Sequence, residues 1–260
     1  MHHPDRPLTG PAGVLERLGL GAIALADCLW LYLRILGGRA RLDLPAFAAA
    51  LRQSGLSVLP ALTLVSVVLG LILGRQGEQL LAGFALPDAL LISLTYAIAL
   101  ELLPVLIGIL VAGRAGVALA VRQAGLAVSG ELDGLLVNGI DPIRYTLAPT
   151  LLAMLLMSAA FAVWSLLVTG LTTWAWLWAS VALGPARLVE TLAHAIGPTD
   201  LIGALVKPPL FALLVAPLAC VNGIAAGRDP RGIARAATAT MLGAIGLILV
   251  ADLLYLLLIG

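Results

Sequence analysis

The chain has 260 residues, of which 61% are hydrophobic and only 11% are charged, and its mean hydropathy is +1.08. A soluble domain carries roughly 25% charged residues, so this chain is expected to be an integral membrane protein. Its net charge of +1 gives no field that would attract nucleic acid. Cys28 and Cys220 are far apart in the sequence, and they predict neither a disulfide framework nor a metal site.

The N-terminal region is predicted to lie on the cytoplasmic face. The first 17 residues are polar and rich in Pro and Gly, so a mobile tail is expected, and they lack the pattern of a cleaved signal peptide. Leu18 to Leu33 is apolar, but it is interrupted by Asp27 and is shorter than the roughly 20 residues of a span. An interfacial helix lying in the membrane plane is therefore favoured over a true span. Arg34 to Arg52 follows as a basic connector.

A membrane domain of transmembrane helices is predicted over residues 53–260, after a cytoplasmic region over residues 1–52. Its apolar runs are approximately Leu56–Leu73, Ala89–Ala112, Tyr145–Ala186, Leu201–Ala226 and Ala236–Ile259. The turn Arg75 to Asp88 is expected to join the first two. The uncharged run Tyr145–Ala186 is long enough for either one long span or two spans in a hairpin.

The basic residues decide between these alternatives. One span in the long run gives five spans in all, with the N-terminus in the cytoplasm and the C-terminus in the periplasm. Twelve of the 15 Lys and Arg residues then lie on the cytoplasmic side: Arg6, Arg17, Arg34, Arg39, Arg41, Arg52, Arg114, Arg122, Arg144, Arg228, Arg231 and Arg235. A hairpin would move the last three outside, against the positive-inside rule, so five spans are predicted. Trp174, Trp176 and Trp178 then fall at the outer interface.

The segment Gly113 to Tyr145 is the longest polar interval between apolar runs, and it is interpreted as a cytoplasmic loop. Four apolar residues within it share one face of a helix: Leu132, Leu135, Leu136 and Ile140. Two interpretations remain. A short amphipathic helix could lie in a groove of another protein, or the same face could pack on the ends of the chain's own spans.

Three ionisable residues are predicted at membrane depth: Glu101, Lys207 and Asp252. Each costs about 2.5 to 3.5 kcal/mol at the centre of a span, so each is expected to face protein or a water-filled cavity. They form either an ion pair that only sets helix packing or a polar feature beside a substrate path. Lys207 is the only lysine and lies in no phosphate-binding loop, and no HExxH zinc motif occurs, so the chain is expected to be a non-enzyme without a metal or cofactor of its own.

Several motifs resemble the MlaE family of ABC-transporter permeases over about Leu51 to Gly260. The most specific is GRAG…VSGELDGLLVNGIDPIRY, which begins at Gly113 and ends at Tyr145. Further matches are GLILGRQG from Gly70, ELLP from Glu101, Lys207 with Phe211, Asn222-Gly223 and GRDPRGIARAATATM…AD, which ends at Asp252. The chain differs from the family pattern at Leu100, Val117, Gln123 and Gly130, where the family commonly has Arg, Ser, Glu and Glu.

The resemblance implies a homodimeric permease that moves phospholipid or a related lipid between membranes and resides in the inner membrane. Two cytoplasmic ABC ATPase subunits would hydrolyse the ATP, and an MCE-domain lipid-binding protein would act on the outer side. The loop after the second span would be an amphipathic coupling helix. Its ATPase-coupling residues would be Glu131, Leu132, Asp133, Leu135, Leu136, Asp141, Pro142 and Arg144, and the substrate-path charges would be Glu101, Lys207 and Asp252.

Two other classes of function stay open at this point. An ion-coupled secondary transporter would use Glu101 and Asp252 as proton or ion sites, although no internal repeat is evident in the sequence. A membrane scaffold without transport activity would need neither buried charges nor a docking helix. The sequence specifies neither the lipid nor the direction of transport.

Overall fold

The computed structural model describes residues 11–39, 43–52, 55, 57–83, 88–139, 143–227 and 229–259. Every regular element within these ranges is a helix, which confirms the all-α class. Six stretches are long and apolar enough to cross a membrane: Gly19–Leu36, Leu59–Gln79, Ile92–Ser129, Tyr145–Val181, Pro198–Ile224 and Arg231–Leu258. The last five correspond to the predicted spans.

The N-terminal helix is longer than the sequence suggested. Helix α1 runs over Pro11–Leu36, so it begins inside the expected tail. A helix can extend through this segment because Pro11 stands at its first position and no further proline occurs before Leu36. Its position in the membrane plane stays a prediction, since Gly19–Leu36 also has the length and composition of a span. A second short helix, α2 (Leu44–Leu51), lies within the expected connector.

The long uncharged run forms one continuous helix, α7 (Ala148–Val181), and not a hairpin. At 1.5 Å per residue its 34 residues extend about 50 Å, which exceeds the roughly 30 Å of a hydrocarbon core. The other long helices are α3 (Leu59–Gly83), α4 (Asp88–Val111), α9 (Pro198–Ile224) and α10 (Arg231–Ile259). Helix α3 continues to Gly83, so the prediction of a turn from Arg75 to Asp88 is wrong for its first nine residues.

The interpretation of residues 113–145 as a loop is also wrong for its first half. Helix α4 passes through a π-helical turn, η2 (Ala112–Gly116), into α5 (Val117–Ser129). Only Arg114 and Arg122 are charged in this part, no proline interrupts it, and α5 ends at Gly130, whose φ is +76°. Helix α6 (Glu131–Val137) follows, and a second π-helical turn, η3 (Ile143–Leu147), leads into α7. Helix α8 (Pro185–Ala195) lies in the segment before α9.

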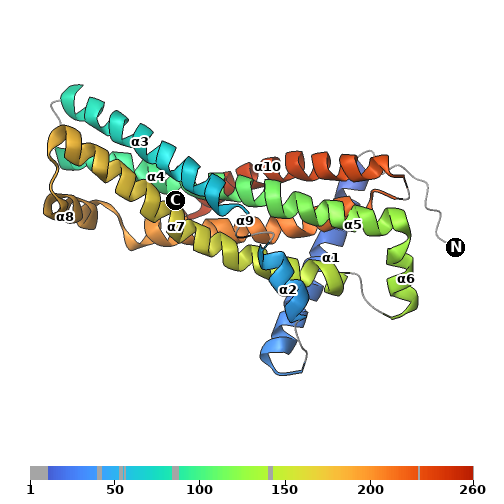
Figure 1. The fold of residues 1–260 in the computed structure, drawn as a ribbon. Coiled ribbons are helices and arrows are strands. Elements are labelled where there is room, and N and C mark those ends of the chain that lie inside the picture. Colours follow the sequence, from blue (N-terminus) through green and yellow to red (C-terminus); the bar gives the residue numbers. More distant parts are fainter. Residues whose placement is uncertain are drawn as a thin grey trace. The chain divides into compact units, whose positions relative to one another are not determined.

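The chain forms two compact units, each assembled from separate segments. The first unit contains Met1–Leu51, Ala112–Ala153 and Leu213–Leu247, and the second contains Arg52–Val111, Met154–Ala212 and Ile248–Gly260. In the second unit α3 (cyan), α4 (teal) and α7 (gold) run side by side (Figure 1).

Small residues bring α3 and α7 close together in the second unit. A Cβ added at Gly70 would lie 2.6 Å from Thr172 Cβ, and one at Gly74 would lie 2.6 Å from Trp176 Cβ. The Thr169 hydroxyl donates to the carbonyl of Ser66 at 3.0 Å, and the Thr173 hydroxyl donates to the carbonyl of Gly70 at 3.1 Å. Close approach and interhelical hydrogen bonds of this kind hold helices together in lipid, where no hydrophobic effect drives association.

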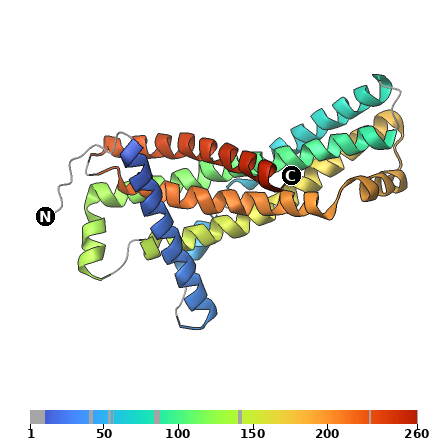
Figure 2. The same cartoon turned by 180° about the vertical axis from the view of Figure 1, so that it is seen from behind.

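In the first unit, α1 packs on η3 and on the C-terminal part of α9. The Tyr32 hydroxyl donates to the carbonyl of Ala148 at 2.6 Å, and a Cβ at Gly21 would meet Pro217 at 3.6 Å. Helix α6 turns away from the axis of α5 at Gly130, and this turn is visible from both sides (Figures 1 and 2).

Candidate functional site

The strongest candidate site is an ion cluster in the second unit formed by Lys207, Glu101 and Asp252. Lys207 lies in the middle of α9, Glu101 in α4 one turn before Pro104, and Asp252 near the end of α10. The Lys207 Nζ donates to Glu101 Oε2 at 2.5 Å and lies 3.1 Å from Asp252 Oδ1. Lys207 therefore contacts both acids, so the three residues that were singled out by their cost in a membrane form one cluster.

The three side chains differ sharply in exposure. Lys207 is 2% exposed, Asp252 is 24% exposed and Glu101 is 56% exposed. An ammonium group this deeply enclosed is stable only because carboxylates lie against it, since an unpaired charge would lose its hydration without compensation. The two acids and one base carry a formal charge of −1. The cluster thus combines an enclosed cation with a carboxylate that other molecules can reach.

Tyr255 completes the cluster, although it was not among the residues predicted from the sequence. Its ring centroid lies 4.8 Å from the Lys207 Nζ, a cation–π distance. Tyr255 follows Asp252 by three residues, so both side chains lie on one face of α10. Gly203, one turn before Lys207 in α9, leaves room for this ring, because a Cβ there would lie 3.0 Å from the Tyr255 hydroxyl. The sequence signal that could have predicted it is an aromatic residue one helical turn after an acid within an apolar run.

The predicted coupling residues are on α6 in the first unit, and none of the residues of α6 is buried by the described part of the chain. Leu132 and Leu135 are half-buried, and Leu136 is 61% exposed. Glu131 and Asp133 are exposed. Because two of the three leucines are half-buried, packing on the ends of the chain's own spans stays the alternative interpretation of this face. Arg144 lies in η3, while Ile140, Asp141 and Pro142 lie outside the described residues.

The first unit also contains a neutral buried cluster around Gln123, a position noted only as a departure from the family pattern. The Gln123 Nε2 donates to the Thr146 hydroxyl and lies 3.5 Å from Cys220 Sγ. Gln123 and Thr146 are 0% exposed and Cys220 is 1% exposed. The Gln123 Oε1 has no hydrogen-bond partner among the described residues. This cluster joins α5, η3 and α9.

Gly223, of the Asn222-Gly223 pair, allows α9 to pack closely against α5. A Cβ at Gly223 would lie 2.5 Å from Gln123 Cβ and 2.6 Å from the carbonyl oxygen of Ala120. Helix α9 can therefore approach the backbone of α5 only if this residue has no side chain. The neighbouring Asn222 donates to the Thr240 hydroxyl at 3.2 Å, which connects α9 to α10 within the same unit.

The three tryptophans proposed for the outer interface lie in the last two turns of α7. Trp174 stacks on Trp178 with ring centroids 5.4 Å apart, and the Trp176 Nε1 donates to Glu78 Oε2 at 2.7 Å. The sequence analysis placed Glu78 in a turn, whereas it lies in α3 and receives this hydrogen bond. The position of these residues at a membrane interface stays a prediction.

Comparisons with known proteins point to a family of membrane permeases. The profile of the family described as Permease MlaE matches residues 47–258. A probable ABC transporter permease protein of Rickettsia felis is 24% identical over 200 residues, which cover 77% of each chain. The intermembrane phospholipid transport system permease protein MlaE of Haemophilus influenzae is 25% identical over 212 residues, covering 78% of each. The Arabidopsis thaliana chloroplastic protein TRIGALACTOSYLDIACYLGLYCEROL 1 is 29% identical over 160 residues, which are 61% of this chain and 45% of that protein.

Proposed function

The chain belongs to the MlaE family of ABC-transporter permeases, and from that premise we propose that it moves phospholipid between membranes. The name of the Haemophilus influenzae relative supports this substrate class. The observation that carries the proposal is the enclosed Lys207 beside the half-exposed Glu101. A lipid has a charged head group and apolar tails, so its path needs a few polar groups within an apolar wall.

In this proposal the cluster contacts the head group of the lipid as it passes. Lys207 is held by both acids until a phosphate competes for its ammonium group. Glu101 is the exposed member, so its carboxylate is the first group that a head group meets. An intramembrane charge that faces a path is a frequent functional feature, because its cost would otherwise select against it.

We further propose that energy comes from two cytoplasmic ABC ATPase subunits that dock on α6. The leucine face of α6 supports this assignment: Leu136 is 61% exposed, Leu132 and Leu135 are half-buried, and an apolar face that is not fully buried fits a groove of a partner. A homodimer and an MCE-domain protein on the outer side complete the proposed assembly. ATP is hydrolysed by the partner subunits, and this chain contributes no cofactor site.

The proposed orientation places the N-terminus in the cytoplasm and the C-terminus in the periplasm of an inner membrane. It rests on the excess of arginine in the segments assigned to the cytoplasm. A reporter that is active only in the cytoplasm should be silent when fused after Gly260. Activity of that fusion would reverse the orientation.

The transport proposal is tested with the complex purified through this chain and reconstituted into donor vesicles. Transfer of a fluorescent phospholipid should require ATP and should fall at least tenfold in Lys207→Met when equal amounts of folded complex are compared. Transfer that proceeds without ATP but follows an ion gradient would instead support a secondary transporter that uses Glu101 and Asp252. A stable Lys207→Met complex with normal transfer would exclude the cluster from the lipid path.

The docking proposal is tested by Leu135→Asp, which places a charge in the leucine face of α6. The variant should insert and fold normally but lose its ATPase on co-purification, because a buried unpaired carboxylate opposes the contact. Gly134→Asp is the matched control: it adds the same carboxylate on the opposite side of the helix, where nothing lies within 4 Å of a Cβ. Equal ATPase recovery in both variants would contradict docking through this face.

A further inference from the structure

The charge that the Lys207 cluster offers to other molecules is negative. Two acids and one base give it a formal charge of −1, and its cation is its most enclosed member: Lys207 is 2% exposed, against 24% for Asp252 and 56% for Glu101. The Lys207 Nζ contacts a carboxylate on each of two helices and the ring of Tyr255. An ammonium group surrounded in this way has little left to offer a ligand.

Glu101, in contrast, keeps capacity for a ligand. Its Oε2 accepts the hydrogen bond from the Lys207 Nζ at 2.5 Å. An ionised carboxylate accepts hydrogen bonds through both of its oxygens, so one ion pair does not saturate it. Because more than half of this side chain is open, a second cation can approach it without first displacing Lys207.

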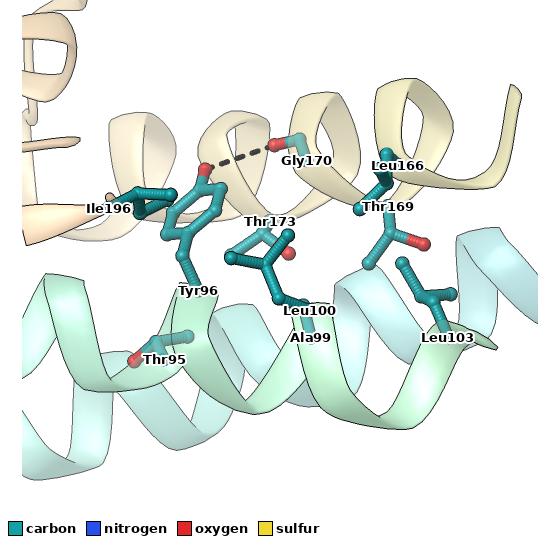
Figure 3. Close-up of a pocket in the computed structure, with 10 residues that line it drawn as sticks. All are labelled: Thr95, Tyr96, Ala99, Leu100, Leu103, Leu166, Thr169, Gly170, Thr173 and Ile196. Carbon is teal, nitrogen blue, oxygen red and sulfur yellow. Dashed lines mark hydrogen bonds between the residues drawn. The ribbon is translucent and has the colours of Figure 1, made fainter. Parts of the chain in front are cut away.

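Glu101 stands in an apolar face of α4. The residues around it at helical spacing are exposed and uncharged: Leu94, Ala97, Ile98 and Leu102. Another side of the helix, with Ala99, Leu100 and Leu103, faces α7 and is buried (Figure 3). Both sides belong to Ile92–Ser129, a stretch with the length and hydropathy of a membrane span. A molecule that lies along the exposed face therefore needs apolar parts for the aliphatic side chains and a positive charge for Glu101.

This requirement separates phospholipids by their head groups. The head group of phosphatidylglycerol carries only the negative phosphate, which the exposed carboxylate repels. The head group of phosphatidylethanolamine also carries a positively charged nitrogen close to its phosphate. When this nitrogen pairs with Glu101, it weakens the hold of Glu101 on Lys207, and the Lys207 ammonium can then pair with the phosphate. Such attraction and repulsion are strong beside apolar surfaces, where little water screens them.

We propose that Glu101 selects phospholipids whose head group carries a positively charged nitrogen, over phospholipids whose head group is only anionic. The inference rests on the proposed function, in which a head group meets this cluster, and it adds the class of head group. Asp252 and Tyr255 act as positioning residues, because they hold the Lys207 ammonium while Glu101 pairs with the nitrogen.

The test measures binding and not transport. The full chain is purified in detergent, freed of bound lipid and titrated with phosphatidylethanolamine, phosphatidylcholine or phosphatidylglycerol that share the same acyl chains, and occupancy is read by native mass spectrometry. Phosphatidylethanolamine should bind roughly tenfold more tightly than phosphatidylglycerol, which is less than an unscreened charge would give, because Glu101 is partly open to solvent. Phosphatidylcholine has the same charge on nitrogen but no N–H, so its affinity should lie between the other two.

Glu101→Gln removes the charge and keeps the size of the side chain. The preference for phosphatidylethanolamine over phosphatidylglycerol should fall to about twofold or less. Lys207 keeps Asp252 at 3.1 Å, so the variant should fold, and thermal unfolding checks this. Glu190→Gln is the matched control, because Glu190 is exposed on α8 and lies outside the stretches that are long and apolar enough to span a membrane. It should keep the wild-type preference.

Equal affinity of the wild type for phosphatidylethanolamine and phosphatidylglycerol, or binding of neither, would overturn the proposal. A preference that persists in folded Glu101→Gln would also overturn it, since another group would then cause the preference. Phosphatidylcholine that binds as weakly as phosphatidylglycerol would show that the positive charge is not what is recognised. If Glu101→Gln does not fold, the wild-type affinities alone decide.

The binding assay needs neither ATP nor a partner subunit, so its failure is distinct from a failure of transport. Equal affinities together with ATP-dependent transfer would overturn the head-group selectivity alone. A clear preference in a chain whose complex transfers no lipid would overturn the transport proposal alone.

Discussion

The chain has two clusters of polar side chains inside its helical packing, and they differ in charge and in exposure. The Lys207 cluster of the second unit holds three charges, and its carboxylate Glu101 is 56% exposed. The Gln123 cluster of the first unit is neutral and fully enclosed, and among the described residues the Gln123 amide oxygen has no hydrogen-bond partner. A cluster that serves packing can close completely, whereas one that meets a ligand has to leave a group within reach.

The difference in charge also determines how much stability is lost when residues of each cluster are substituted. Breaking a buried ion pair leaves an uncompensated charge, while replacing the whole pair by apolar groups is often neutral for stability. Removing a neutral amide forfeits only the net value of its hydrogen bonds, about 1 kcal/mol each. The comparison therefore predicts large, rescuable effects at Lys207 and small ones at Gln123.

The largest effect is expected for Lys207→Met, which keeps the length of the side chain and removes its ammonium group. It should lower the free energy of unfolding by about 2 to 3 kcal/mol, below the roughly 3 to 5 kcal/mol of a fully buried pair, because Glu101 can be hydrated. Folded yield and thermal unfolding in detergent measure this loss.

The neutral triple variant Glu101→Gln, Lys207→Met, Asp252→Asn separates structure from function. It should regain stability to within about 1 kcal/mol of wild type, because no charge is left unpaired. Lipid transfer should remain lost if the charges serve transport. Wild-type transfer by the triple variant would show that the Lys207 cluster serves only helix packing, as is proposed for the Gln123 cluster.

A smaller effect is expected where the first unit has no space for a side chain. Gly223→Ala should lower the free energy of unfolding by about 1 to 3 kcal/mol, because its Cβ would overlap Gln123 and the carbonyl of Ala120. Gly125→Ala on α5 is the control, since nothing lies within 4 Å of its Cβ. Similar thermal stability for the two variants would show that α9 does not pack tightly on α5.

The sequence allowed the Lys207 cluster to be predicted because charge has a known cost in a membrane. Glu101, Lys207 and Asp252 are ionisable residues within apolar runs, so their cost indicates that they are paired or face water. The same argument located the long helices, since uncharged runs of sufficient length have few alternatives in lipid. The positive-inside rule correctly favoured one helix over a hairpin in Tyr145–Ala186.

The features that were missed have no comparable signal. Gln123 is uncharged, so its burial has no cost that a composition pattern could reveal. Arg114 and Arg122 suggested a loop, but two charges in this stretch do not interrupt a helix when their long side chains can extend to a polar boundary.

The smallest effect is expected for Gln123→Leu, which replaces the enclosed amide by an apolar side chain of similar size. The variant loses the hydrogen bond to Thr146 but also removes an oxygen that has no partner in the described structure. These terms oppose one another, so the free energy of unfolding should change by less than about 1 kcal/mol. Thermal unfolding measures the change, and Gln123→Ala is the matched comparison, because it leaves a cavity and should cost more.

Lipid transfer and ATPase recovery should both be retained in Gln123→Leu if the cluster serves only to hold α5 against η3 and α9. Loss of ATPase recovery with unchanged stability would instead show that the polar groups of this cluster set the position of α6, and the first unit would then depend on its buried polar atoms for function as the second does.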